Sequence, residues 1–185
     1  MTIVRPSLTY DTNFPITIGG WGCYTLAQRT LTGRPIIVHG DGASLWVVTH
    51  AADLARGFTG LIGNPRALGH AFHITSDEVL TWNQIYAIIA EALGAHANVV
   101  HIPSDFIAHV APELGADVLR DMTWSVVCDN NKIKSFVPGF QTAIPFREGT
   151  RRTLARFDAI AERKRVEKQV DAEMDRIFSA YNRFE

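Results

Sequence analysis

Short apolar runs alternate along this chain with longer segments of helical periodicity. The runs are rich in β-branched residues and predict buried strands at 36–39, 45–49, 71–74 and 98–102. Apolar residues spaced three or four apart predict helices at 22–32, 81–93 and 105–122, the last broken near Pro112 or Gly115. Strands that alternate with helices favour an α/β fold.

The first residues predict a strand that runs straight into a polar loop. Ile3 and Val4 are β-branched, and Arg5-Pro6 should stop the strand because proline has no N–H for a ladder. Such a strand belongs inside a parallel sheet, buried on both faces. Its flanking strands must then come from elsewhere, and exposed edges lead us to expect self-association.

Local signals set several element boundaries. Thr81 and Gln84 have the spacing of a capping box, and Gly94 should end that helix. Residues 126–128 are expected to pair briefly as a strand, and Asn130 to cap a short helix.

The last stretch of the chain has a different composition. Residues 147–176 are dense in charge, and apolar residues recur at helical spacing at Val166, Val170, Met174, Ile177, Phe178 and Tyr181. We expect residues 159–185 to form an amphipathic helical tail that docks on its own domain, 1–158, or on a partner.

Composition limits the function classes. A chain of 185 residues with 46% hydrophobic residues suits one domain or a fragment of a larger one. A net charge of −1 argues against a broad nucleic-acid surface. No apolar run approaches a bilayer span and no signal peptide precedes residue 10. Cys23 and Cys128 are isolated thiols, so we expect a cytoplasmic protein without disulfides.

Four segments in order resemble the second half of an extended short-chain dehydrogenase/reductase of the NAD-dependent epimerase/dehydratase family. They are TIVRPSLTYD (2–11) and residues 33–58, 71–94 and 129–158. The resemblance implies the carboxyl-terminal portion of a Rossmann-type fold, comprising the last sheet strands, a small mixed α/β substrate domain and a long C-terminal helix. The family's first half carries the glycine-rich cofactor loop and a tyrosine-x-x-x-lysine pair.

The catalytic pair is absent from this sequence. Residues four places after Tyr10, Tyr24, Tyr86 and Tyr181 are Phe14, Gln28, Ala90 and Glu185. The triplet Gly57-x-x-Gly60-x-x-Gly63 lies at the end of a predicted helix, whereas a phosphate loop must open one. NAD or NADP is therefore expected in the complete enzyme and not on this chain alone.

The resemblance places candidate ligand contacts after the first strand. It implies that Pro6, Ser7 and Leu8 approach the cofactor mainly through backbone, and that Thr9 and Tyr10 face a small-molecule substrate. Loops at the carboxyl end of a strand are the usual place for ligands. The alternative is that Pro6 and Tyr10 only fix the loop.

A second candidate region follows the turn Gly40-Asp41-Gly42. Family members that bind nucleotide-sugars have an arginine there, and this chain has Trp46. An indole replaces the charge that a diphosphate would want, so the substrate need not be a standard nucleotide-diphosphate sugar. A core aromatic is the alternative. His39 and His50 are further candidate substrate contacts, or structural histidines.

No metal site is expected. His70 and His73, three residues apart on a strand, would point to opposite faces. Asp53 should orient the start of its helix, and Asp77 and Glu78 should be structural.

These observations predict the substrate-binding portion of an NAD(P)-dependent epimerase, dehydratase or reductase acting on a sugar-like or nucleotide-sugar-like substrate. Alone it should be inactive, and its partner would be the N-terminal Rossmann half. Two alternatives stay open: a non-catalytic binding module of the same fold, RNA-binding or regulatory, and an assembly element that uses the tail helix.

Overall fold

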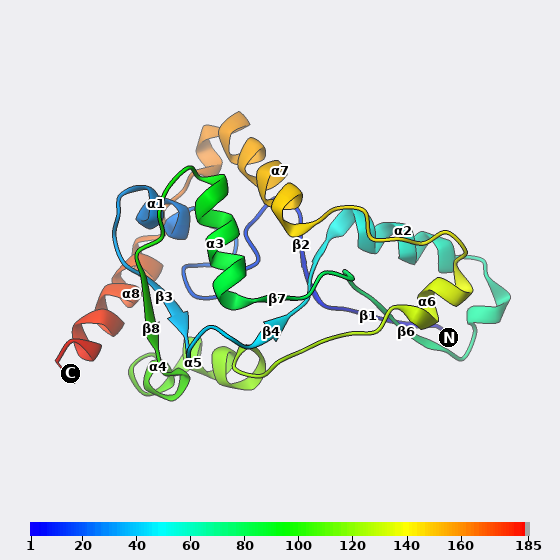
Figure 1. Cartoon of the computed structure of the whole chain (residues 1–185), viewed down its shortest axis with the longest axis horizontal. Helices are drawn as coiled ribbons and strands as arrows, with labels where there is room; N and C mark the ends of the chain where they lie inside the picture. Colours follow the sequence, from blue (N-terminus) through cyan, green and yellow to red (C-terminus); the bar gives the residue numbers. More distant parts are fainter. Residues whose placement is uncertain (184–185) are drawn as a thin grey trace.

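The computed structural model describes residues 1–183 as an elongated α/β molecule with a larger body and a narrower extension. The N-terminus lies in the extension, and the last described residues, up to Arg183, lie at the far side of the body (Figure 1). The strands are β1 (Ile3–Pro6), β2 (Leu8–Tyr10), β3 (Ile36–His39), β4 (Leu45–Trp46), β5 (Val48–His50), β6 (Ala71–Ile74), β7 (Leu80–Thr81) and β8 (Val99–Ile102).

Helices connect and cover these strands. They are α1 (Thr25–Leu31), α2 (Ala51–Leu61), α3 (Trp82–Ala92), α4 (Ser104–Val110), α5 (Pro112–Asp117), α6 (Asn131–Phe136), α7 (Phe146–Ala159) and α8 (Lys168–Tyr181). Short 3₁₀ turns occupy Pro65–Ala67 and Ala161–Arg163, and a π turn occupies Val118–Met122. No helix within residues 1–183 combines the length and the apolar character needed to cross a membrane.

The strands associate in pairs. β1 pairs with β6, β2 with β5 and β3 with β8, all parallel, while β4 pairs with β7 in antiparallel fashion. Each parallel pair is joined by a crossover that contains at least one helix. The predicted α/β character is confirmed, as are the strands at 36–39 and 71–74.

The start of α3 confirms the predicted capping box. The Thr81 hydroxyl accepts the Gln84 N–H at 3.1 Å, and the Gln84 side chain accepts the Thr81 N–H at 2.8 Å. Gly94 follows the helix with a φ of +67°. A left-handed conformation there suits glycine and ends the helix where expected.

The first strand ends at Pro6, as the sequence predicts, but two other expectations for it were wrong. Residues 8–10 form β2 instead of a polar loop. Ile3 donates its N–H to His70 O at 3.0 Å, so the Pro6 nitrogen, an odd number of residues away, faces the other edge and costs no ladder bond. Ile3 is 40% exposed instead of buried.

Other expectations also need correction. The strand expected at 45–49 is two strands separated at Val47, where the chain passes from β7 to β2 as its neighbour. Residues 126–128 form no strand, although Val126 N–H donates to Leu45 O at 2.8 Å. Asn130 precedes α6 without capping it, because its side chain bonds the backbone of Thr75.

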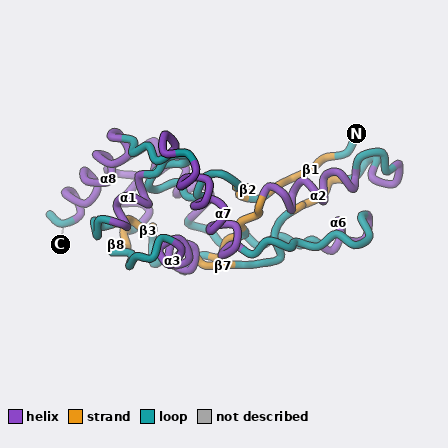
Figure 2. Tube along the Cα trace, turned by 90° about the horizontal axis from the view of Figure 1, so that it is seen from above, coloured by secondary structure: helices purple, strands orange, loops and turns teal. Residues whose placement is uncertain are grey.

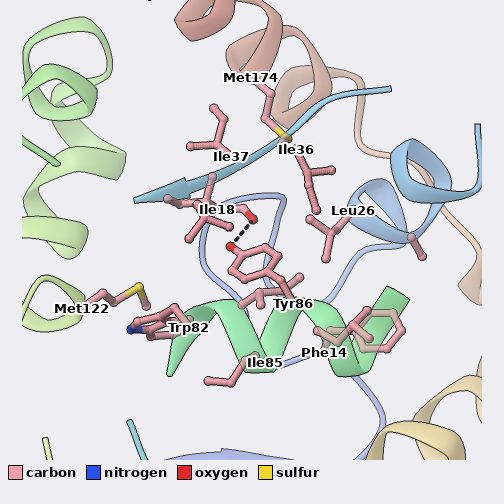
Figure 3. Packing of buried hydrophobic residues seen from close by; sticks show 14 of the residues in the cluster. Phe14, Ile18, Leu26, Ile36, Ile37, Trp82, Ile85, Tyr86, Met122 and Met174 are labelled. Atoms are coloured by element: carbon pink, nitrogen blue, oxygen red, sulfur yellow. Dashed lines mark hydrogen bonds between the residues drawn. The ribbon is translucent and has the colours of Figure 1, made fainter. Parts of the chain in front are cut away.

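The body contains the main core. Figure 3 shows residues of α3 packed beneath the loop before α1 and beneath β3, with the Tyr86 hydroxyl donating to Ile18 O at 3.3 Å. Aromatic and aliphatic side chains fill this space, among them Phe14, Ile18, Leu26, Ile36, Ile37, Trp82, Ile85 and Met174. The core therefore joins residues from nearly the whole length of the chain.

The extension has a second, smaller core. Seen from above, β1, β6, α2 and α6 form this narrow end of the molecule (Figure 2). Its buried members are Leu61, Ala67, Phe72, Ile74, Ile133 and Phe140. Two glycines of the triplet serve this packing: a Cβ at Gly57 would overlap Ile74, and one at Gly60 would overlap Val137. Both lie within α2, and Gly63 follows that helix, so the triplet lies at the end of a helix as predicted.

The tail is helical over part of its length and docks on the body. Within 159–185, helix α8 covers Lys168–Tyr181, and residues 184–185 lie outside the described part. Met174 of α8 points toward β3 (Figure 3). Buried Arg29 binds Asp171 and Asp175 at 2.6 and 2.8 Å, and Arg34 binds the same two carboxylates. Helix α8 therefore packs against the body.

Candidate functional site

The carboxyl ends of β2 and β5 bring two predicted residues together. Tyr10 and His50 are directly paired in the parallel register. Their rings meet edge to face with centroids 5.4 Å apart, and Phe146 of α7 contacts the other side of Tyr10 at 5.3 Å. Both side chains are buried, with exposed fractions of 4% and 5%. A sheet edge of this kind is where α/β proteins hold ligands.

His50 presents a free N–H donor. It is the N-cap of α2, and its Nδ1 accepts the Ala52 N–H at 3.2 Å. Burial lowers the pKa of His50, so the ring is neutral near pH 7 and its proton sits on Nε2. Nε2 has no hydrogen-bond partner in the described part of the chain. It lies 3.7 Å from Asp11 Oδ1, whose side chain is 48% exposed.

Tyr10 presents a second free donor. Burial, together with the negative charges of Glu78 and Asp53, raises the pKa of the phenol well above its usual range. The hydroxyl is therefore protonated, and it too lacks a partner among residues 1–183. It packs against Gly149 in the middle of α7, where a Cβ would overlap the phenol oxygen. No sequence pattern indicated this role of Gly149.

Two carboxylates bring α7 to this site. Asp53 accepts the backbone N–H groups of Ala143 and Ile144 at 3.2 and 3.0 Å, and it also binds Arg56. Glu78 accepts the N–H of Phe146 at 2.6 Å, at the N-terminus of α7 where negative charge is favourable. The expectation that Asp53 orients the start of its helix was wrong, because His50 caps α2 and the Asp53 carboxylate holds a distant segment. Glu78 is structural, as expected.

Hydroxyl groups link the strands beside the pair. Ser7 Oγ and Thr49 Oγ1 are 2.7 Å apart, and Thr49 Oγ1 accepts the Ser76 N–H at 2.8 Å. Thr9 donates to Ser7 O at 3.0 Å. Pro6 is exposed and Leu8 is half-buried. The Ser7 and Thr9 side chains therefore have protein partners.

The other predicted residues lie in the main core. Trp46 is 8% exposed and packs against Trp82 at 5.7 Å between ring centroids, and His39 meets Trp82 at 5.1 Å. His39 Nε2 donates to Met122 O at 2.9 Å, and burial lowers the His39 pKa. Both indole N–H groups lack a partner in the described part. Trp82 was missed from sequence, because its position at the start of α3 marks only a helix.

Metal binding finds no support in the described residues. Within 1–183, no group of three or more His, Cys, Asp or Glu side chains could hold a metal ion. Gly57 and Gly60 lie within α2 and pack against Ile74 and Val137, so the triplet does not form the loop before a helix that a pyrophosphate requires.

Known proteins resemble this chain in sequence and in fold. No family model matches the chain. The 2'-dehydrokanamycin reductase of Streptomyces kanamyceticus is 29% identical over 121 residues, which cover 65% of this chain and 33% of the reductase.

Solved structures match the fold over most of the chain. The epimerase Mth375 of Methanothermobacter thermautotrophicus gives a TM-score of 0.67 at 19% identity, covering 87% of this chain and 44% of that protein. The UDP-glucuronic acid 4-epimerase of Bacillus cereus, in complex with NAD, gives 0.61 at 14%, covering 87% and 44%. The UDP-glucose 4-epimerase of Thermotoga maritima gives 0.64 at 19%, covering 85% and 46%.

The chain spans a third of the curated reductase and under half of these solved epimerases. It therefore has part of the fold of the NAD-dependent epimerases of the extended short-chain dehydrogenase/reductase type.

Proposed function

We propose that this chain is the substrate-binding part of an NAD(P)-dependent enzyme that acts on a sugar-like substrate. The observation that carries the proposal is the pair of unused donors, Tyr10 Oη and His50 Nε2, side by side at the carboxyl ends of β2 and β5. An unpaired buried N–H or O–H is costly, and it marks a place where a ligand can supply the missing acceptor.

In this proposal one substrate hydroxyl group would bridge His50 and Asp11 after the Asp11 side chain turns aside. An oxygen about 2.8 Å from each of two groups that are 3.7 Å apart can accept from Nε2–H and donate to the carboxylate. The Asp11 side chain is 48% exposed, and such side chains change rotamer readily to admit a ligand. Sugars present several hydroxyls that can be recognised in this way.

The substrate class follows from what the site lacks. The family's nucleotide-sugar members have an arginine where this chain has Trp46, which is buried against Trp82. No fixed charge at that position would hold a diphosphate. The curated relative is named for reduction of 2'-dehydrokanamycin, a sugar derivative without a nucleotide in its name. We therefore favour a sugar-like carbonyl compound over a nucleotide-diphosphate sugar, and reduction over epimerisation or dehydration.

Hydride transfer would depend on a nicotinamide held by another segment. Some solved relatives are complexed with NAD. This chain has no phosphate cradle in its glycine triplet and no tyrosine-x-x-x-lysine pair. Its own residues would bind and orient the substrate, with His50 donating to a substrate oxygen and Tyr10 closing the inner side. Pro6, Ser7 and Leu8 would border the cofactor.

Calorimetric titration of the 185-residue chain tests the proposal. We expect 2'-dehydrokanamycin to bind more tightly than UDP-glucose. His50→Asn keeps an N-cap acceptor for α2 but removes the Nε2 donor, so it should weaken binding about tenfold. The control is His73→Asn, at an exposed position of β6, which should leave affinity unchanged.

Either of two results would contradict the proposal. If neither compound binds, the chain is not a substrate-binding part for this class. If both histidine variants weaken binding equally, the ligand does not use the Tyr10–His50 site.

A further inference from the structure

Asp11 places a carboxylate beside the Tyr10–His50 site that the described chain does not use. Within residues 1–183 its side chain accepts no hydrogen bond, and the one ion-pair partner in reach is His50 Nε2, 3.7 Å from Oδ1. The side chain is 48% exposed, as is ordinary for an aspartate in a loop. The neighbouring N–H, however, is buried and has no acceptor in that part of the chain, so two complementary groups face the same place.

The backbone fixes the position of this carboxylate. Asp11 directly follows Tyr10, the last residue of β2, which is paired in the parallel register with His50. The Thr153 hydroxyl of α7 donates to Asp11 O at 2.7 Å. The backbone of Asp11 therefore stays beside the imidazole, while its exposed side chain can change rotamer around a ligand.

Carboxylates dominate the charge around the site. Burial is the main cause that raises the pKa of Tyr10. Three carboxylates raise it further, those of Glu78, Asp53 and Asp11, whereas one arginine lowers it. Glu78 and Asp53 accept backbone N–H groups at the start of α7 and before it. Asp11 is therefore the carboxylate of the three that a ligand can use.

Two arginines near the site are already paired. After burial, which is the main cause, Arg152 and Arg56 both lower the pKa of the site's imidazole. Arg152 Nε binds Glu148 at 2.9 Å. Arg56 Nη2 binds the buried carboxylate of Asp53 at 3.0 Å. The positive charge of these arginines is thus offset by their own partners, and the charge of Asp11 stays available to a cation.

A metal ion does not suit this position. His50 Nδ1 accepts the Ala52 N–H, so the nitrogen that faces Asp11 carries the proton and has no lone pair for a metal. The complementary ligand instead has an oxygen acceptor for the imidazole N–H and a cationic N–H donor for the carboxylate.

We propose that the substrate is an amino sugar, with a hydroxyl that accepts from His50 Nε2–H and an ammonium on the neighbouring carbon that binds Asp11. A carboxylate has two oxygens, so Asp11 can accept from the hydroxyl and from the ammonium together. Because Nε2 and Oδ1 are only 3.7 Å apart, the two ligand groups must be on adjacent carbon atoms to reach both. The inference rests on the proposed function and narrows the substrate class of the same site.

Titration of the full 185-residue chain with glucosamine and with glucose tests the inference, with NMR signals of the His50 imidazole as the readout. The two sugars differ only at carbon 2, and at about pH 6.5 the amine is protonated. Glucosamine should bind about five times as tightly as glucose, as expected for a partly exposed ion pair. Added salt should reduce this ratio, because Asp11 is accessible to solvent ions.

Matched variants separate the charge of Asp11 from its structure. Asp11→Asn keeps the size of the side chain and removes the charge, so it should bring the ratio of the two affinities close to one. Asp121→Asn removes a carboxylate of the π turn that is 55% exposed, and it should leave the ratio unchanged. His50→Asn should weaken the binding of both sugars and preserve the ratio, because the donor that it removes serves the hydroxyl.

Equal affinity of the unchanged chain for the two sugars would overturn the inference, and so would a preference for glucosamine that survives Asp11→Asn. Absence of binding by either sugar would also overturn it. The titration with 2'-dehydrokanamycin tests the proposed function separately, because His50-dependent binding of that compound does not require a role for the Asp11 charge.

Discussion

At the scale of single residues, the contact with Tyr10 accounts for a glycine at position 149. A glycine inside a helix normally costs stability relative to alanine, yet here a methyl group would overlap the phenol. We expect Gly149→Ala to lower the free energy of unfolding by about 1–3 kcal/mol, as overpacking does. Urea denaturation measures this change.

The Tyr10 hydroxyl allows a matched double-mutant test. Tyr10→Phe removes a buried donor that has no partner in the described part, so it should leave the free energy of unfolding unchanged or slightly higher. It should also reduce the cost of Gly149→Ala, since the phenol oxygen is the nearest obstacle. Equal costs of Gly149→Ala in both backgrounds would show that the hydroxyl is not what excludes the methyl group.

Two buried histidines predict a pH dependence of stability. Burial lowers the pKa values of His39 and His50, so the unfolded chain binds more protons than the folded one below about pH 6.5. The melting temperature should therefore fall as the pH drops from about 7 to about 5. His50→Asn should lessen that fall and exposed His73→Asn should not. A flat profile across this range would contradict the prediction.

At the scale of elements, two arginines hold α8 with the same two carboxylates but differ in burial. Arg29 is 1% exposed and also donates to Pro35 O at 2.9 Å, whereas the Arg34 side chain is 41% exposed. Arg29→Leu should cost about 3 kcal/mol of unfolding free energy, because a buried network loses its centre. Arg34→Leu should cost about 1 kcal/mol or less. Thermal denaturation compares them, and equal losses would mean that burial does not decide their contributions.

The elements that could be predicted are those specified by contacts between residues close together in sequence. Thr81 and Gln84 fixed the start of α3 because a capping box is a contact between residues three apart. The division of the predicted strand at Val47 could not be predicted, because it arises where the chain changes its partner strand from β7 to β2. The predicted cap at Asn130 was wrong for a related reason. The Asn130 side chain donates to Thr75 O, which is distant in sequence, and does not bond the helix that follows it.

The candidate site was also predictable only in part. Tyr10 and His50 were named from sequence, and the structure brings them together at the end of one strand pair. Glu78 and Gly149 act on that pair through α7, a helix distant in sequence, so no spacing rule could assign their roles. Trp46 lies in the main core, which agrees with the alternative interpretation of it, and its contact with a ligand stays a prediction.

At the scale of the whole molecule, we expect no tight binding of NAD by the chain alone. Gly57 and Gly60 lie within α2 against packed side chains, and Gly63 follows that helix. A pyrophosphate requires backbone N–H groups at a helix N-terminus that follows a strand and a glycine loop. Calorimetry with NADH should therefore show no sub-micromolar affinity, and such an affinity would mean that another part of the chain forms a nucleotide site.

The strand pairing has a kinetic consequence. Ile3 lies against Ala71, and Ile36 against Val99, so both pairs join residues far apart in sequence. Contacts of this kind require closure of long loops before any ladder bond forms, and high contact order slows folding. Until β6 pairs with it, β1 exposes both of its edges, and nascent chains in such states are prone to wrong association. The time between the synthesis of β1 and that of β6 thus sets how long β1 lacks a partner strand on the ribosome.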